Sequence, residues 1–244
     1  MRCTVLMPMG GLGSRFADAG YTTPKPLIEV DGKPMFLRAT ESFPESWDLD
    51  SVFVVRKEHE ERFGLARMIA EASPEARIAL LDHDTRGPVE TCLEARELVN
   101  PEIPIVVADC DIRFRSIAYV SMAESGDYDG ILASFRSRDP RYSYAEVGED
   151  GFVCRTAEKV PISEHALLGG YWFRSGGRFF SLADEFMKMG LPDGLAEYYL
   201  SHLFNIALSD GDRIGLADVD GYDIWGTPEE LDAYVAASRN GGES

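Results

Sequence analysis

Short apolar runs alternate with segments of helical periodicity through the first half of this 244-residue chain. Runs of strand length lie at residues 4–7, 52–55, 78–81 and 105–108, and helical patterns lie between them at residues 34–43, 58–72 and 88–99. An alternation of this kind predicts βαβ units, in which parallel strands form one sheet and helices cover its faces. Ligands bind to such sheets just beyond the carboxyl ends of the strands. The residues that follow each run are therefore the first candidates for a functional site.

The second half of the chain has a different pattern, with strand candidates that follow one another closely. They lie at residues 130–135, 144–147, 152–155, 168–173 and 213–219, and helices are predicted at residues 177–188, 195–208 and 228–238. The GEDG sequence at residues 148–151 is typical of a hairpin turn, and Thr227 with Glu230 indicates a capping box for the last helix.

These patterns predict one α/β domain over residues 1–239, followed by a polar tail at residues 240–244. We expect a Rossmann-like three-layer sandwich with a mixed, mainly parallel central sheet and an antiparallel insertion. Residues 1–128 would form one half of this domain and residues 129–239 the other.

The chain is strongly acidic, with a formal net charge of −18 at pH 7. This charge argues against a nucleic-acid surface, which needs a basic footprint, and it serves most simply to keep the protein soluble. Residues 1–40 are an exception, because five basic and three acidic residues give this stretch a net charge of +2. A site for a phosphorylated ligand would therefore lie there.

Composition and cysteine spacing indicate where the protein works. No apolar run approaches the roughly 18 residues that span a membrane, and the N-terminal segment becomes glycine-rich too early for a signal peptide. The four cysteines are too far apart for a zinc site or a disulfide framework: Cys3, Cys92, Cys110 and Cys154. We expect buried free thiols in a cytoplasmic protein without membrane insertion, and the sequence is compatible with a homo-oligomer.

A glycine-rich segment, MGGLGSRF at residues 9–16, follows the first predicted strand directly. Its three glycines let backbone amides approach phosphate oxygens closely, and amides at a helix start favour anions. Two common phosphate-binding motifs do not fit this segment. A dinucleotide fingerprint would need glycine in place of Phe16, and a Walker A loop would need lysine in place of Ser14.

A lysine between two prolines follows, in TPKPLI at residues 23–28, and then VDGKPM at residues 30–35. The prolines hold Lys25 in extended backbone, so its ammonium group is aimed with little conformational searching. In this order and spacing, the three segments resemble the nucleotide-sugar pyrophosphorylase family, the nucleotidyltransferases that make activated sugars and related headgroups. Glu197-Tyr198-Tyr199 resembles a feature of short members of capsule or surface-polysaccharide type, although helix packing also explains these residues.

The resemblance implies a GT-A-like nucleotidyltransferase fold and assigns roles around the glycine loop (residues 9–14). Family members hold a nucleoside triphosphate with this loop, which here consists of Met9, Gly10, Gly11, Leu12, Gly13 and Ser14. Arg15 would pair with the β- and γ-phosphates, and Lys25 would bridge the α-phosphate and the phosphate of the acceptor. A planar guanidinium suits two-point contacts with phosphate, whereas a lysine acts as a point charge.

Two aspartates, Asp109 and Asp111, follow the buried run at residues 105–108. Carboxylates at the end of a buried strand are costly unless they are paired or bind a metal, and Mg²⁺ takes one or two carboxylates together with substrate phosphates. A turn capped by these side chains is the alternative. The resemblance places the Mg²⁺ ligand at Asp111, with Asp109 beside it on the ribose side.

The second metal ligand of the family has no direct counterpart. Many members carry an aspartate two residues before the glycine of a late GT motif, which here is Gly226-Thr227, and Ile224 occupies that position. Asp223 is adjacent, but on a strand it would point to the opposite face. Asp223 could reach the metal through a bulge, Asp111 and phosphates could suffice, or another acid could substitute.

A weaker likeness covers the segment that reads the nucleobase in the family. Residues 85–91, TRGPVET, stand at this place and assign base contacts to Gly87, Pro88 and Glu90. An ordinary helix start explains the proline equally well.

Residues 157–161, AEKVP, resemble the EKP signature with which the family binds its acceptor. The resemblance assigns sugar hydroxyls to Glu158 and the acceptor phosphate to Lys159, although the two could also form a surface ion pair of little value. Gly169 and Gly170 would let the acceptor lie against the backbone.

The sequence therefore predicts an Mg²⁺-dependent nucleotidyltransferase that transfers a nucleoside monophosphate from a triphosphate to a small phosphorylated acceptor and releases pyrophosphate. The acceptor would be a sugar 1-phosphate or a phosphocholine-like phosphate. One alternative is a glycosyltransferase with Asp109-Cys110-Asp111 as a DxD metal motif, and another is a silent nucleotide-binding protein, suggested by Ile224. Glycosyltransferases do not need the glycine loop and the PKP segment, so these two features favour the nucleotidyltransferase.

Overall fold

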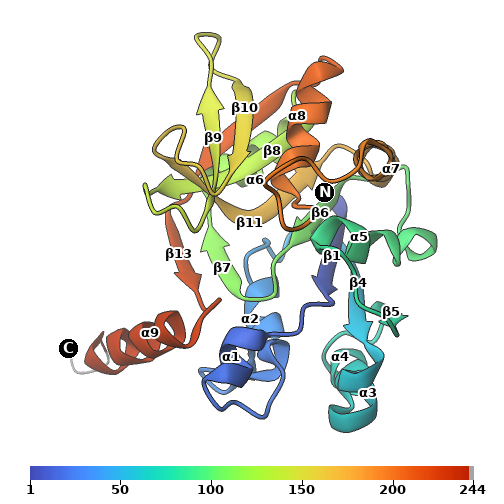
Figure 1. Cartoon of the computed structure of the whole chain (residues 1–244), viewed down its shortest axis with the longest axis vertical. Coiled ribbons are helices and arrows are strands. Elements are labelled where there is room, and N and C mark those ends of the chain that lie inside the picture. The colour runs from blue at the N-terminus through green and yellow to red at the C-terminus, as the bar shows by residue number, and fades with distance from the viewer. Residues whose placement is uncertain (242–244) are drawn as a thin grey trace.

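A nine-stranded mixed sheet forms the centre of the computed structural model, which describes residues 1–241 (Figure 1). Its parallel part consists, in order across the sheet, of β6 (Ile105–Ala108), β1 (Arg2–Met9), β4 (Asp48–Arg56) and β5 (Arg77–Leu81). The sheet continues from β6 with antiparallel β11 (His165–Phe173), β9 (Ser143–Val147) and β10 (Val153–Glu158). Alongside β11 lie β8 (Gly130–Arg136) and its parallel partner β12 (Ile214–Asp218). The predicted α/β class with a mixed sheet and an antiparallel insertion is confirmed.

Helices cover both faces of the sheet because successive side chains of each strand point into opposite cores. In β1, Leu6 lies in one core, whereas Val5 and Met7 lie in the other. The core of Leu6 includes side chains of α5 (Pro88–Leu93), α7 (Gly176–Met189) and α8 (Ser201–Ser209). The core of Val5 includes side chains of α2 (Met35–Thr40), α4 (Leu65–Ala72) and α6 (Ile117–Ser125). Two further helices are α3 (Lys57–Phe63) and the 3-10 helix η2 (Arg96–Leu98).

A third, smaller core joins the first and last parts of the chain. It contains side chains of α1 (Ser14–Asp18), β2 (Glu29–Val30), α2 and α9 (Pro228–Gly241). The 3-10 helix η1 (Lys25–Leu27) precedes β2, and β3 (Lys33–Pro34) pairs with it. The ribbon of β7 (Ile112–Arg115) and β13 (Gly221–Ile224) leads into α9, which lies at the edge of the molecule in Figure 1. Phe16, Met35 and Trp225 are buried together in this core. The fold therefore brings the C-terminal segment next to the residues that follow the glycine loop.

Several helices differ from the sequence prediction for local reasons. The helix predicted at residues 58–72 is divided into α3 and α4 at Gly64, whose φ of 64° is left-handed. The helix predicted at residues 195–208 begins only at Ser201. The segment before it bonds elsewhere, because the Tyr198 N–H donates to the Arg86 carbonyl at 2.8 Å. The sequence pattern does not indicate α6, since its apolar residues do not form one stripe.

The last helix begins as predicted and ends later. The Glu230 N–H donates to the Thr227 hydroxyl at 3.2 Å, which confirms the predicted cap. Helix α9 continues to Gly241, into the predicted polar tail, and residues 242–244 lie outside the described residues. No helix within residues 1–241 is long and apolar enough to cross a membrane.

All four cysteines are free thiols, as expected, and three of them are buried. The expectation of burial is wrong for Cys154, which is exposed on β10. This residue lies at an irregularity in the pairing of β10 with β9, on the edge strand of the sheet, where one face meets solvent.

Candidate active site

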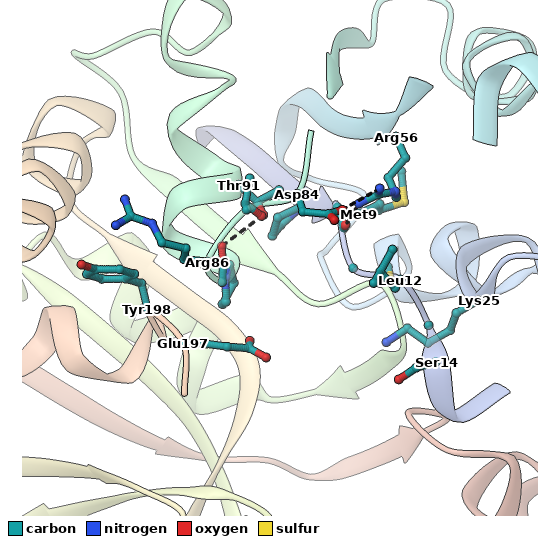
Figure 2. Close-up of a pocket in the computed structure, with 18 of the residues that line it drawn as sticks. Met9, Leu12, Ser14, Lys25, Arg56, Asp84, Arg86, Thr91, Glu197 and Tyr198 are labelled. Carbon is teal, nitrogen blue, oxygen red and sulfur yellow. Dashed lines mark hydrogen bonds and ion pairs between the residues drawn. The ribbon is translucent and has the colours of Figure 1, made fainter. Parts of the chain in front are cut away.

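A cavity of about 780 Å³ opens at the carboxyl ends of the parallel strands (Figure 2). Three segments line it: the glycine loop with Pro8, residues 84–88 (the α5 loop), and residues 196–198 ahead of α8. The other lining residues belong to other parts of the chain: Lys25, Pro26, Arg56, Thr91, Cys110 and Leu191. The structure thus brings together the whole predicted glycine loop with Lys25, Gly87 and Pro88.

The glycine loop presents backbone donors that have no internal partner. Within residues 1–241, the N–H groups of Gly11, Leu12 and Gly13 donate no hydrogen bond to the protein. Gly13 has a φ of 62°, a left-handed conformation that glycine adopts without strain at the start of α1. A Cβ at Gly10 would lie 2.8 Å from Thr91 Cγ2, so glycine alone fits there. Unpaired amides in such a concave loop suit the oxygens of a phosphate.

Lys25 and Asp111 form an ion pair, with 2.8 Å between Nζ and Oδ2. Their side chains are only 26% and 14% exposed. Figure 2 shows the Lys25 side chain pointing into the space between the glycine loop and Glu197. Burial acts to lower the pKa of Lys25, but the adjacent negative charge of Asp111 raises it above its usual value. Lys25 is therefore a fixed cation at neutral pH.

Asp109 lies deeper, against an irregularity in β11 at Gly169 and Gly170. Its N–H donates to the Gly169 carbonyl at 3.0 Å. Burial and the charge of Asp111 raise the pKa of Asp109 to about 7. A Cβ at Gly169 would overlap the Asp109 carboxylate, and one at Gly170 would lie 2.6 Å from the ring of Phe114. The two glycines predicted to face the acceptor thus make room for side chains of this chain.

The predicted metal ligands, Asp111 and Asp223, pair with different cations, Asp111 with Lys25 and Asp223 with Arg113. Asp223 accepts hydrogen bonds from Arg113 at 2.7 and 2.9 Å, and β13 pairs with β7 in continuous register, so no bulge redirects it. A different acid approaches Asp111. A Cβ at Gly226 would lie 2.9 Å from Asp111 Oδ2 and 3.2 Å from Glu230 Oε2, so both carboxylates converge on this glycine. Among the described residues, no three His, Cys, Asp or Glu side chains converge as a metal cluster.

Glu158 and Lys159 lie at the end of β10, close to the start of α8. Glu158 Oε2 accepts hydrogen bonds from the hydroxyls of Ser143 and Ser201, the latter at 2.9 Å. Lys159 has a φ of 56°, which is unusual for a residue other than glycine. Its Nζ donates to the Tyr199 hydroxyl at 2.7 Å, and this bond raises the pKa of Lys159. No ion pair within the described chain links Glu158 to Lys159, so the surface-pair alternative does not hold.

Nine predicted residues do not line the cavity: Asp109, Asp111, Glu158, Lys159, Gly169, Gly170 and Asp223, described above, and also Arg15 and Glu90. Arg15 is exposed at the start of α1. Glu90 is held by Arg86, with 2.6 Å between Oε1 and Nη2, and this contact lowers the pKa of Glu90. Glu90, a residue of α5, therefore stabilises the α5 loop through its ion pair with Arg86.

Arg56 and Asp84 line the cavity, although the sequence analysis singles out neither. Arg56 is the last residue of β4, and Asp84 follows β5 closely. The rule that ligands bind at the carboxyl ends of parallel strands, applied to every strand, would have identified both.

Comparison with known proteins places the chain in a family. The family of MobA-like NTP transferase domains matches residues 5–157, more than half of the chain. The chain belongs to this family. The predicted membership among the nucleotidyltransferases is thereby confirmed. No curated protein sequence matches this NTP transferase.

Two solved structures extend the comparison over nearly the whole chain. The nucleoside-diphosphate-sugar pyrophosphorylase from Vibrio cholerae RC9 is 25% identical, with a TM-score of 0.81, over 95% of this chain and 99% of that one. The inositol-1-phosphate CTP transferase from T. maritima has the same fold at 17% identity, with a TM-score of 0.75, over 98% and 96% of the two chains. The family match ends at residue 157, so Lys159, Tyr199 and Glu230 of this NTP transferase lie beyond it.

Proposed function

We propose that this NTP transferase transfers a nucleoside monophosphate from a nucleoside triphosphate to a small phosphorylated acceptor and releases pyrophosphate. The observation that carries the proposal is the part-buried pair of Lys25 and Asp111, 2.8 Å apart, next to a loop with unpaired amides. An acidic chain with a charge of −18 repels phosphates unless a local site attracts them. The glycine loop and Lys25 supply that attraction.

Mg²⁺ is the metal that this donor set fits. It takes one or two carboxylates and completes its shell with water and substrate phosphates. Asp111 and Glu230 are the carboxylates that would hold it, because an oxygen of each lies close to Gly226. When bound, the ion neutralises the charge of the phosphates. An arginine pairs with each candidate second acid, Arg113 with Asp223 and Arg141 with Glu230 Oε1. Glu230 is preferred because its other oxygen, Oε2, faces Gly226 beside Asp111.

The reaction requires no nucleophile from the protein. An acceptor phosphate oxygen attacks the α-phosphorus in line, a new P–O bond forms, and the bond to the β-phosphate breaks with its electrons leaving on pyrophosphate. Lys25 and Lys159 both have raised pKa values and stay charged, so they hold the two reacting phosphates against their mutual repulsion. The attacking oxygen is already ionised at neutral pH, so no base is needed. Arg15, next to the glycine loop, would reach the outer phosphates.

We propose a sugar 1-phosphate or a phosphocholine-like phosphate as the acceptor. No described hydrogen bond uses Glu158 Oε1, which leaves this oxygen for acceptor hydroxyls. Lys159 Nζ stands over the Tyr199 ring, 4.7 Å from its centroid, so the ring helps to hold this ammonium for the acceptor phosphate. The product would be an activated headgroup for surface-polysaccharide synthesis, made in the cytoplasm.

A pyrophosphate-release screen tests this function. ATP, CTP, GTP, UTP and dTTP are each combined with glucose 1-phosphate, inositol 1-phosphate and phosphocholine in Mg²⁺ buffer, with EDTA as the control. We expect pyrophosphate and a nucleotide-linked product from at least one pair, and neither after EDTA. Nucleoside diphosphate released from a nucleotide sugar would indicate the glycosyltransferase instead. Triphosphate binding without turnover on any acceptor would indicate a silent nucleotide-binding protein.

A further inference from the structure

The side chain of Arg56 contacts the backbone of the glycine loop. β4 runs parallel to β1 with Val55 opposite Met9, so the next residue, Arg56, stands beside the point where the loop begins. Arg56 Nη1 donates to the Gly10 carbonyl at 2.9 Å, and its side chain is only 13% exposed. Figure 2 shows it next to Met9 and Asp84.

This contact determines which way the following amide points. A trans peptide is planar, and its carbonyl and N–H point in opposite directions. Because Arg56 holds the Gly10 oxygen, the Gly11 N–H is directed away from the guanidinium, and this N–H has no acceptor within the described chain. A peptide between two glycines would otherwise rotate over a wide range. Gly10 is also confined on its other side, since a Cβ there would lie 2.9 Å from Leu81 Cδ2.

The same guanidinium reaches the opposite wall of the cavity. Arg56 Nη2 donates to Asp84 Oδ1 at 2.8 Å, and Asp84 belongs to the α5 loop. The planar fork of an arginine directs separate nitrogens at separate acceptors, whereas the single ammonium of a lysine does not reproduce this geometry. Arg56 therefore connects the glycine loop to the α5 loop.

We propose that Arg56 is a positioning residue for the nucleoside triphosphate, which fixes the Gly10–Gly11 peptide so that the Gly11 amide faces a phosphate. This inference rests on the proposed function for the identity of the ligand. Asp84 contributes to this positioning, because it accepts the hydrogen bond from the second terminal nitrogen of Arg56. The rival role for Arg56 is a direct ionic contact with phosphate, in which charge alone would matter.

The test measures triphosphate binding by calorimetry, with Mg²⁺ present and acceptor absent. It uses the nucleoside triphosphate that the wild-type protein binds most tightly. The variants are Arg56→Ala, Arg56→Lys and Asp84→Asn, with Arg62→Ala as the matched control, because Arg62 forms an exposed pair on α3. We expect about 10-fold weaker binding for both Arg56 variants, the loss of one or two oriented hydrogen bonds. We expect about threefold weaker binding for Asp84→Asn, which keeps an acceptor oxygen but loses the charge that strengthens the bond to Arg56. Arg62→Ala should bind like the wild type.

Steady-state kinetics then separate positioning from general damage. In Arg56→Lys, the KM for the triphosphate should rise while the KM for the acceptor stays constant, which partial unfolding would not produce. Asp84 is 72% exposed, so Asp84→Asn tests the fork even if Arg56→Ala folds poorly. Wild-type binding by Arg56→Lys, or no effect of Asp84→Asn, overturns the proposal. A wild type that binds triphosphate but never releases pyrophosphate refutes the proposed function alone, and a wild type that binds no triphosphate refutes both.

Discussion

The proposed nucleotide side and the proposed acceptor side of the site use different kinds of groups, and only the nucleotide side lines the cavity. The nucleotide side, formed by the glycine loop and the α5 loop, offers consecutive backbone amides that have no internal acceptor in the described structure. The acceptor side, formed by Glu158, Lys159 and Tyr199, offers side chains that already hydrogen-bond to one another or to serines. Under the proposed function, the triphosphate would therefore meet unpaired donors, whereas the acceptor would have to replace internal hydrogen bonds. Under the proposed function, Lys25 would serve both sides.

Lys25→Ala should have the largest effect, because it removes the cation common to both sides. We expect pyrophosphate release to fall by about 10³-fold, the upper range for a group that stabilises transition-state charge. Lys33→Ala is the control, since Lys33 forms an exposed pair with Glu41 worth at most about 1 kcal/mol. Circular dichroism should show both variants folded. Turnover near the wild type in folded Lys25→Ala would contradict the shared role.

The second prediction concerns which acid joins Asp111. Asp111→Asn should lose about 10²-fold in activity and most of its Mn²⁺ binding, measured by electron paramagnetic resonance with an unreactive triphosphate analogue. Glu230→Gln should weaken Mn²⁺ binding about 10-fold, whereas Asp223→Asn should leave it unchanged, because Glu230 Oε2 and not Asp223 is among the atoms that face Gly226 beside Asp111. Equal losses of Mn²⁺ binding in Asp223→Asn and Asp111→Asn would indicate that Asp223, on β13, is the second metal ligand.

A third prediction concerns the contact between the α5 loop and the segment before α8. Gly87 has a φ of 132°, and a Cβ there would lie 2.6 Å from the Tyr198 nitrogen. Gly87→Ala should therefore lower the free energy of unfolding by about 2 kcal/mol, measured by urea denaturation. Gly11→Ala is the control, because nothing lies within 4 Å of a Cβ at that position and its stability should stay within about 0.5 kcal/mol. If the two variants were equally stable, the α5 loop would not depend on this contact.

The smallest predicted effect is on the acceptor side. Lys159→Ala should raise the KM for the acceptor about 10-fold, the loss of one charge-assisted hydrogen bond, and leave the KM for the triphosphate unchanged. Tyr199→Phe removes the hydroxyl that holds Lys159 and keeps the ring, so its acceptor KM should not rise by more than about twofold. A rise in the triphosphate KM of Lys159→Ala would remove the distinction between the two sides.

The nucleotide side was predictable from local sequence because its parts are consecutive residues. Glycines directly after a buried strand indicate a loop with free amides, and the prolines around Lys25 restrict its backbone. The acceptor side was less predictable, since the roles of Glu158 and Lys159 depend on Ser201 and Tyr199, some 40 residues away along the chain. The start of α8 was misplaced for a related reason: its first expected residues hydrogen-bond to the α5 loop instead.

The sequence by itself determined the alternation of strands and helices, the phosphate-binding loop, and the gap that Ile224 leaves among the acids. It did so because each of these depends on neighbouring residues and on side-chain periodicity. Only the tertiary structure decided that Arg56 holds the Gly10 carbonyl, that Asp223 pairs with Arg113, and that Glu230 approaches Asp111. These contacts join residues from separate strands and helices. Such residues are placed side by side by sheet order and helix packing, which no local sequence pattern contains.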